Sequence, residues 1–218
     1  PSFGLNYAVA LYGLNKKIPF AENHKTENPI SIYAVSKKTN ELMANTYSKL
    51  FGFKAIGLRF FTVYGPYGRP DMALFKFTKK ILNRQKIEVF NNGKMIRDFT
   101  YIDDVIESIY RVVDCLLNKK KKLFTNVDEK NKNHHIFNVG NSKPVKLTDY
   151  IKELEKYLKI KANKKNLPMQ KGDVYSTYSN SKKLKNFIKY APTTSVNAGI
   201  SKFVDWYKDY YKINKLWL

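Results

Sequence analysis

Apolar positions in the first third of the chain predict a helix followed by a strand. The helix is expected between Pro29 and Gly52, since proline favours the first turn of a helix and glycine the position just past its end. The segment 54–65, KAIGLRFFTVYG, predicts a strand that ends in a Gly-Pro loop. A helix followed by a strand favours the α/β class with a parallel sheet. Apolar residues of the helix recur mostly at three- and four-residue intervals and form one stripe: Ile32, Val35, Leu42, Met43, Thr46, Tyr47 and Leu50.

The rest of the chain alternates in the same way. Strands are predicted in the apolar opening 1–13, which then turns, and at 87–92 and 136–141. Helices are predicted over about 72–84, over 149–159 with Thr148 as the N-cap, and over 195–212.

Segment 97–117 is expected to combine a brief strand with an amphipathic helix, and Cys115 to pack in or beside the core. The apolar stripe of this helix is Val105, Ile106, Ile109, Val112, Val113 and Leu116. Residues 118–135 are predicted to form a polar, lysine-rich loop that carries His134 and His135 at the surface.

Composition indicates a folded protein. Hydrophobic residues make up 43% of the 218 residues and aromatic residues 15%, which is not typical of disorder. No apolar run approaches the roughly 18 residues of a membrane-spanning helix, and no secretory signal is recognisable. The single cysteine excludes an internal disulfide framework and is typical of a reducing compartment. We therefore expect a soluble cytoplasmic protein without a membrane partner.

The net charge of +22 suggests a polyanionic partner, but its make-up argues against nucleic acid. Arginine, the preferred residue for phosphate forks and base edges, occurs at five positions only, and the lysines are scattered along the chain. An anionic small substrate fits the same charge.

Motifs with recognisable chemistry are scarce. The chain contains no Gly-x-Gly-x-x-Gly and no P-loop, so it carries no dinucleotide fingerprint of its own. No residues have the spacing of a metal site, and none suggest a Ser/His/Asp or Cys/His nucleophile.

Tyr33 and Lys37 form the one pair that suggests catalysis. Residues four apart share a helix face, so the ammonium can lie near the phenol. A nearby positive charge favours phenolate and lowers the pKa of a tyrosine, which would make Tyr33 a general base for a substrate hydroxyl. A packed tyrosine beside a solvated lysine has the same spacing, so the pair alone leaves both interpretations open.

The surrounding segments decide in favour of catalysis. In order over nearly all of residues 11–211, they resemble the extended short-chain dehydrogenase/reductase enzymes, most closely the UDP-glucuronate 4-epimerases. The matching segments are YGLNKKIPF, YAVSKKTNELMANTYSKLFG, GLRFFTVYGPYGRPDMALFKFTKKIL, GKMIRDFTYIDDV, FNVGNSKPV, LPMQKGDV and TSVNAGISKFVDWYKDYY.

The resemblance implies a nucleotide-sugar epimerase with tightly held NAD. Tyr33 would take the proton from the sugar 4-hydroxyl while hydride leaves C4, and Lys37 would hold the cofactor ribose and tune Tyr33. The 4-keto sugar would then turn over and take hydride back on its other face. The substrate contacts that the resemblance implies are Thr62 facing the sugar, Arg69 or less strongly Lys76 at the carboxylate, Arg97 at the diphosphate and Asp173 at the nucleotide ribose.

The resemblance also implies a division of the chain and an incomplete cofactor site. Residues 1–66 would be the C-terminal part of a Rossmann-like parallel-sheet domain, and 67–218 mainly a smaller mixed α/β substrate domain, with segments near 98–117 and 136–141 packing back on the first. The glycine-rich turn that holds the NAD pyrophosphate would precede residue 1, so we expect this chain to be a fragment that is inactive or weakly active alone. The full-length protein would be a homodimer that uses the Tyr33 helix.

One departure concerns the residues before Val-Tyr-Gly. The family has serines or threonines there, whereas this chain has Ala8, Val9 and Ala10, which lack a hydroxyl. Two other functions stay open: another nucleotide-sugar dehydratase or decarboxylase of the same family, and a non-catalytic basic protein that binds polyanions.

Overall fold

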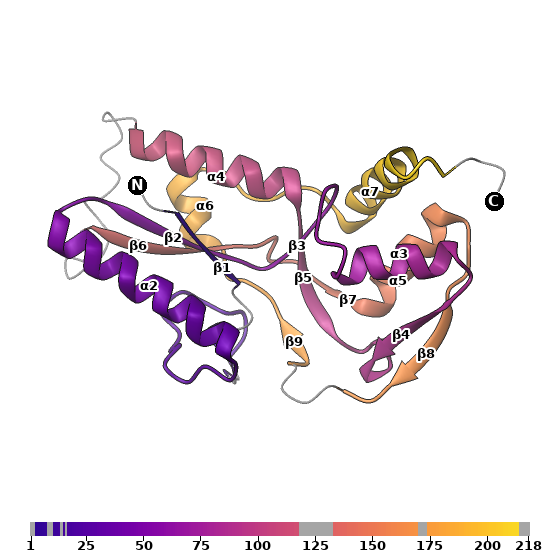
Figure 1. Cartoon of the computed structure of the whole chain (residues 1–218). Helices are drawn as coiled ribbons and strands as arrows, with labels where there is room; N and C mark the ends of the chain where they lie inside the picture. The colour runs from indigo at the N-terminus through magenta and orange to yellow at the C-terminus, as the bar shows by residue number, and fades with distance from the viewer. Residues whose placement is uncertain are drawn as a thin grey trace.

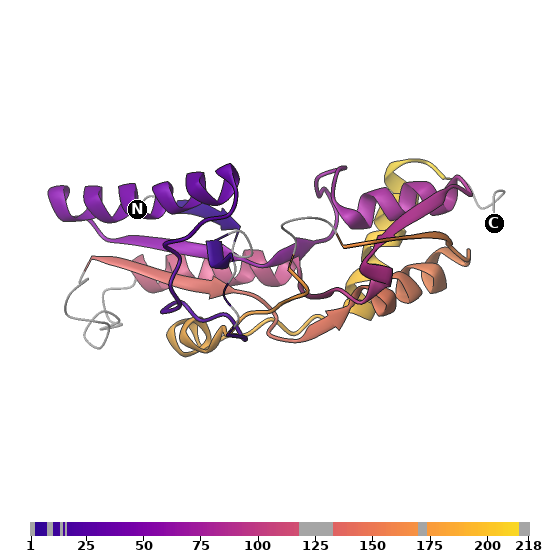
Figure 2. The same cartoon turned by 90° about the horizontal axis from the view of Figure 1, so that it is seen from below.

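Two groups of strands, each with its own helices, make up an elongated molecule (Figure 1). The computed structural model describes residues 3–7, 11–13, 15, 17–117, 133–169 and 174–213. The chain passes between the two groups several times, so each group combines segments that are distant in the sequence (Figures 1 and 2).

The first group is a parallel sheet of three strands in the order β1-β2-β6. The strands are β1 (Phe3–Tyr7), β2 (Ala55–Phe60) and β6 (His134–Val139). The sheet lies between helix α2 (Ile32–Phe51) on one side and helices α4 (Ile102–Leu117) and α6 (Lys182–Ile188) on the other (Figure 2). Its core forms where Leu58 and Phe137 of the strands meet Val112 of α4 and Ile188 of α6.

The second group surrounds a larger aromatic core. Strand β5 (Ile96–Tyr101) pairs with β3 (Thr62–Tyr64), β7 (Pro144–Lys146) and β9 (Ser176–Thr177), while β4 (Lys86–Phe90) pairs with β8 (Asn163–Leu167). The 3-10 turn η1 (Asn91–Gly93) follows β4, and the helices are α3 (Ala73–Leu82), α5 (Leu147–Leu158) and α7 (Val196–Tyr210). Phe99 stacks on Tyr150 with 4.0 Å between ring centroids, in a core that includes Phe203.

A buried carboxylate ties the two groups together. Asp98 of β5 is fully buried and accepts hydrogen bonds from the backbone N–H groups of Asn141 (2.9 Å), Ser142 (3.1 Å) and Ser179 (2.9 Å) and from the Ser179 hydroxyl (2.6 Å). Because Asn141 and Ser142 follow the end of β6 after one residue, Gly140, Asp98 fixes β5 of the second group against the first group's sheet.

Most predicted elements are confirmed, with shifts of a few residues at their ends. The α/β class with a parallel sheet is confirmed, and so is the helix that ends at Gly52, whose φ of 70° is one that glycine adopts readily. Cys115 is buried, as expected. Thr148 is wrong as an N-cap, because α5 already begins at Leu147.

Two other expectations were wrong in detail. His134 and His135 belong to β6, and His135 is buried, because this strand pairs with β2 along its whole length. Ile106 of α4 is 56% exposed and does not join the core. The apolar stripe of α2 faces outward, with Ile32 85% exposed and Leu50 71% exposed. Strand β8 and helix α6 were not predicted.

Candidate active site

The start of helix α2 places Tyr33 and Lys37 where the parallel sheet ends. Ser31 caps the helix, since its hydroxyl accepts a hydrogen bond from the Ala34 N–H at 3.1 Å. The helix runs back along the sheet, so its first turns lie at the end of the molecule's first group where β2 leads into β3 (Figure 1). Carboxyl ends of parallel strands are the usual place for nucleotide binding in such folds.

Tyr33 and Lys37 lie on one face of α2. The Lys37 ammonium lies over the Tyr33 ring, with Nζ 5.1 Å from the ring centroid, and Tyr33 is 46% exposed. The expected spacing is therefore realised: a cation next to a phenol that a small molecule can reach. A general base must be accessible to its substrate, and this half-exposed phenol is accessible.

A cavity of about 370 Å³ opens beside β3, α3 and β5. Three of the predicted substrate residues line it, Thr62, Lys76 and Arg97. The other lining residues are Asp71, Met72, Ala73, Phe77, Lys80, Glu88, Phe90, Met95, Phe99 and Leu147. Its volume lies within the range of small-molecule sites, and its mixture of apolar walls and a few charged groups is typical of them.

Cations outnumber anions in the cavity lining, where Lys76, Lys80 and Arg97 face Asp71 and Glu88. Lys76 and Lys80 are four residues apart on α3 and therefore share one helix face. Lys80 was not singled out from the sequence, although its spacing from Lys76 was the available signal. The lining favours an anionic ligand.

Arg97 is held at the cavity by backbone oxygens. Its Nη1 donates to the carbonyl oxygens of Ile96 (2.9 Å) and Tyr175 (3.2 Å). Its neighbour in the sequence is Asp98, whose hydrogen bonds fix the strand that carries both residues. The guanidinium thus has a rigid support, as a residue that binds a ligand phosphate needs.

Arg69 lies at the rim, in contact with an acidic neighbour. Its Nε donates to Oδ1 of Asp71 at 3.0 Å, and this hydrogen bond holds the pKa of the Asp71 carboxyl below its usual value. Arg69 and Thr62 both line a smaller hollow of about 50 Å³. The structure therefore brings Arg69 near Thr62, but with its guanidinium engaged by Asp71.

Some predicted residues are not joined to this cavity or cannot be placed. Tyr33 and Lys37 do not line it. Asp173 and the segment Ala8–Ala10 lie outside the described residues. A second cavity, of about 590 Å³, is lined by Ser142 and its neighbours and contains none of the predicted residues.

Two kinds of feature are absent from the described ranges. These ranges contain no group of three His, Cys, Asp or Glu side chains that could hold a metal ion. They also contain no helix that is both long and apolar enough to cross a membrane.

Comparison with known proteins identifies the family. Residues 7–140 match the model of the NAD dependent epimerase/dehydratase family, which is more than half of the chain. The chain belongs to this family. Its α/β fold and parallel sheet are thereby those of a family of NAD-dependent enzymes, the extended short-chain dehydrogenases/reductases.

Relatives of this family member cover most of its length. It is 50% identical over 209 residues to an uncharacterized protein of Methanocaldococcus jannaschii, a match that covers 96% of the chain and 58% of that protein. It is 43% identical over 211 residues to UDP-glucuronate 4-epimerase 4 of Arabidopsis thaliana, covering 94% of the chain and 48% of the relative.

A solved structure agrees in fold. The UDP-glucuronic acid 4-epimerase of Bacillus cereus, crystallised with UDP-glucuronic acid and NAD, matches with a TM-score of 0.81 and 30% identity, over 96% of the chain. The match covers 62% of that protein. The chain thus spans about half to three fifths of the length of the relatives that it matches.

Proposed function

We propose that the chain is part of an NAD-dependent UDP-sugar 4-epimerase that interconverts UDP-glucuronate and UDP-galacturonate. The observation that carries this proposal is the cation-lined cavity with Thr62, Lys76 and Arg97, in a chain whose α2 presents Tyr33 beside Lys37. The similarity to named UDP-glucuronate 4-epimerases supports the same substrate class.

Tyr33 is proposed as the general base and Lys37 as its partner. The phenol would accept the proton of the sugar 4-hydroxyl, and the ammonium 5.1 Å from the ring would stabilise the phenolate that this role requires. NAD, when bound, supplies the hydride acceptor. The position of both side chains at the carboxyl ends of parallel strands fits such a cofactor, and Lys37 would hold its ribose hydroxyls.

The substrate would lie along the cavity beside β5. Arg97 would contact the diphosphate, Thr62 the sugar, and Asp173 the nucleotide ribose. Arg69 would receive the sugar carboxylate, since a guanidinium fork matches a carboxylate, and Lys76 is the alternative cation. To do so, the Arg69 guanidinium would have to release the Asp71 carboxylate and bind the carboxylate of the sugar in its place.

The two groups of strands would have separate tasks. Residues 1–66 would complete the NAD-binding domain, together with the segments near 98–117 and 136–141, which supply α4 and most of β6 to this group, and the rest of 67–218 would bind the sugar nucleotide. Support comes from β6 and α4, which share a core with β2.

A homodimer through α2 is the proposed assembly. Large apolar side chains of this helix are exposed: Ile32, Leu42, Met43, Tyr47, Leu50 and Phe51. A surface of this kind is typical of an interaction site.

The test restores the part of the protein that the relatives have and this chain does not match. The chain is joined behind the NAD-binding half of the Bacillus cereus epimerase, and the conversion of UDP-glucuronate is followed by chromatography of the products. We expect UDP-galacturonate to form, and Tyr33→Phe to slow its formation by at least about 10²-fold.

Tyr110→Phe is the matched control, because Tyr110 is an exposed tyrosine of α4 that lies outside the cavity lining. It should leave the rate unchanged. The chain alone should show no measurable turnover. A folded hybrid that retains NAD but converts no UDP-glucuronate would refute the proposed function.

A further inference from the structure

Helix α2, which carries Tyr33 and Lys37, is attached to the rest of the molecule mainly through polar groups. Its buried residues are Ala34, Glu41 and Ser48, while its large apolar side chains face outward. Ala34 has no polar side-chain group, and the Ser48 hydroxyl lies within hydrogen-bond distance of the carbonyl oxygens of Phe53 (2.6 Å) and Asn133 (3.0 Å), at the end of the helix far from Tyr33. Glu41 is the long buried side chain of α2, and it lies closer to Tyr33 and Lys37 along the helix.

Glu41 is held by a buried arginine of the sheet. Arg59 of β2, 2% exposed, donates from Nε to Oε1 of Glu41 at 2.7 Å and from Nη2 to Oε2 at 2.9 Å. Two parallel hydrogen bonds fix the plane of the carboxylate as well as its distance. Burial alone would lower the pKa of Arg59, but its hydrogen bonds and electrostatic attraction to Glu41 and Tyr12 together outweigh this effect and raise the pKa, so the guanidinium stays charged.

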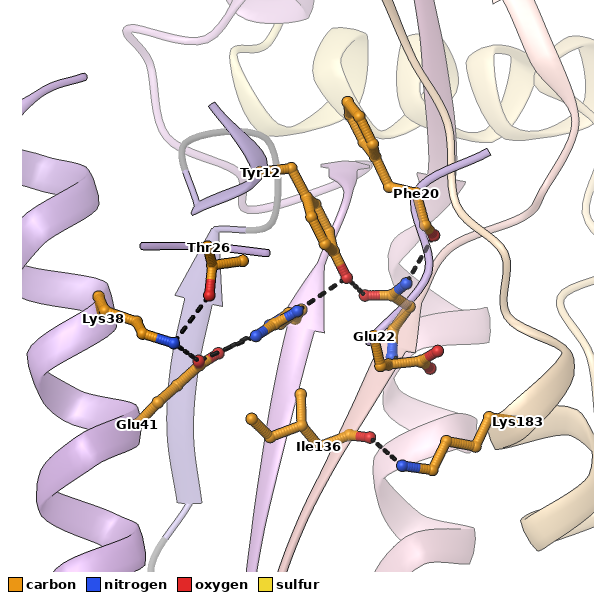
Figure 3. Close-up of polar contacts among 10 residues, drawn as sticks. Tyr12, Phe20, Glu22, Thr26, Lys38, Glu41, Ile136 and Lys183 are labelled. Atoms are coloured by element: carbon orange, nitrogen blue, oxygen red, sulfur yellow. Dashed lines mark hydrogen bonds and ion pairs between the residues drawn. The ribbon is translucent and has the colours of Figure 1, made fainter. Parts of the chain in front are cut away.

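The arginine is itself fixed from the opposite side. Its Nη1 donates to the Tyr12 hydroxyl at 2.9 Å, and that hydroxyl donates to Oδ1 of Asn138 on β6 at 2.6 Å. Figure 3 shows this chain of contacts, with Glu41 and Lys38 reaching from α2 toward the sheet. Lys38 also donates to the Thr26 hydroxyl at 2.7 Å, which ties the preceding loop to the helix.

A buried ion pair of this kind has a cost. Each charge loses several kcal/mol of hydration, so an apolar pair of the same size is often equally stable or more stable. The advantage of the ion pair is its defined geometry. Glu41 is four residues after Lys37 and eight after Tyr33, so all three lie along one face of α2, and a fixed Glu41 fixes the direction of the other two.

We infer that Arg59 is a positioning residue: through its forked contact with Glu41 it sets the rotation of α2 and thereby aims Tyr33 and Lys37 at the bound ligands. Its catalytic consequence rests on the function proposed above. Its structural consequence does not, and it can be measured on this chain alone.

The variant that tests the geometry is Arg59→Met combined with Glu41→Leu, which replaces the ion pair with apolar side chains of similar size. Residual dipolar couplings of the backbone amides give the rotational phase of α2 relative to β2 and β6. We expect this phase to change by more than about 10–20°, the tolerance of a productive site. A folded double variant with an unchanged phase would overturn the inference.

The matched control is Arg111→Met with Glu107→Leu. This pair has the same chemistry, with Arg111 Nε 2.6 Å from Glu107 Oε1, but it is partly exposed on α4. It should leave α2 unchanged. If the main double variant does not fold, Glu41→Gln, which keeps the shape of the side chain and one acceptor oxygen, is measured in the same way and decides by the same criterion.

The catalytic consequence is measured in the hybrid enzyme described above. A displacement of the base by about 1 Å lowers the rate by about 10²-fold, so kcat should fall steeply while KM for the UDP-sugar stays nearly constant. A wild-type hybrid without turnover would refute the proposed function, while the dipolar couplings would still decide the role of Arg59. An active double variant with wild-type kcat would overturn the positioning role.

Discussion

Replacing Asp98 with alanine should destabilise the chain through two specific backbone groups. Of the donors around the carboxylate, the Asn141 N–H keeps the Thr100 hydroxyl as an acceptor at 3.1 Å, and the Ser179 hydroxyl can turn to a neighbouring serine. The N–H groups of Ser142 and Ser179 have no such replacement among the described contacts. Each orphaned donor costs about 1–3 kcal/mol, hence about 2–6 kcal/mol for the pair.

The cost of burying the charged Asp98 carboxylate makes the expected loss of stability smaller than this sum. Burial raises the pKa of the Asp98 carboxyl despite its four donors, so removal of the charge relieves part of the cost. We therefore expect a loss of about 3 kcal/mol in the free energy of unfolding for Asp98→Ala. Asp98→Asn should lose only about 1–2 kcal/mol, because its amide oxygen can still serve both serine N–H groups.

The assay is urea unfolding of the chain, followed by far-UV circular dichroism. Asp103→Ala is the control: this aspartate lies on α4, its side chain is 70% exposed, and its ion pair with Lys202 spans 3.9 Å, so its loss should cost no more than about 0.5 kcal/mol. If Asp98→Ala were no less stable than this control, the hydrogen-bond accounting at Asp98 would be wrong.

Three further predictions concern other parts of the fold. Gly199→Ala should destabilise the chain by about 1–3 kcal/mol in the same urea assay, because the added Cβ would overlap the Tyr64 hydroxyl. A variant as stable as the wild type would contradict this clash. Burial lowers the pKa of His134, so the unfolded chain binds a proton more readily than the folded chain, and the free energy of unfolding should fall as the pH falls below about 6.5. Between about pH 7.5 and 5.5, His134→Gln should lose less of this free energy than the wild type. An equal loss in both proteins would show that His134 does not cause the pH dependence. In the hybrid enzyme, Leu42→Glu with Leu50→Glu should convert the proposed dimer to monomers in sedimentation velocity, and an intact dimer would exclude this face of α2.

The sequence was a good guide where apolar residues decide the structure. The helix predicted over 195–212 is confirmed as α7, and its apolar residues Ile200, Phe203 and Val204, three and four apart, are all buried. Strand β8, Asn-Lys-Lys-Asn-Leu, was not predictable in this way, because it is held to β4 by backbone pairing and has little apolar surface. The start of β6 was missed because two histidines follow a polar run, although the strand is fully paired with β2.

The sequence named several residues of the candidate site but not the contacts that those residues make. Thr62, Lys76 and Arg97 line one cavity because β3, α3 and β5 lie beside one another there, and their roles as substrate contacts stay predictions. The Arg69–Asp71 pair depends on the conformation of an exposed loop, and the spacing of two residues did not reveal it. The role of Arg59 was not predicted, because its partner Glu41 lies on a different element and the sequence does not show that the two side chains meet. Their contact allows the arginine to be buried in the middle of the sheet.

Strand β6 connects the two polar clusters that define this molecule. Asn138 near its end accepts from Tyr12 in the Arg59 cluster, and Asn141 just beyond it donates its N–H to Asp98. The Asn138 side chain does little for the core, since an apolar residue there would bury as much surface without a hydrogen-bond requirement. The value of the two clusters lies in direction: one orients the helix with Tyr33, the other orients the strand with Arg97, and the end of β6 gives both a common reference.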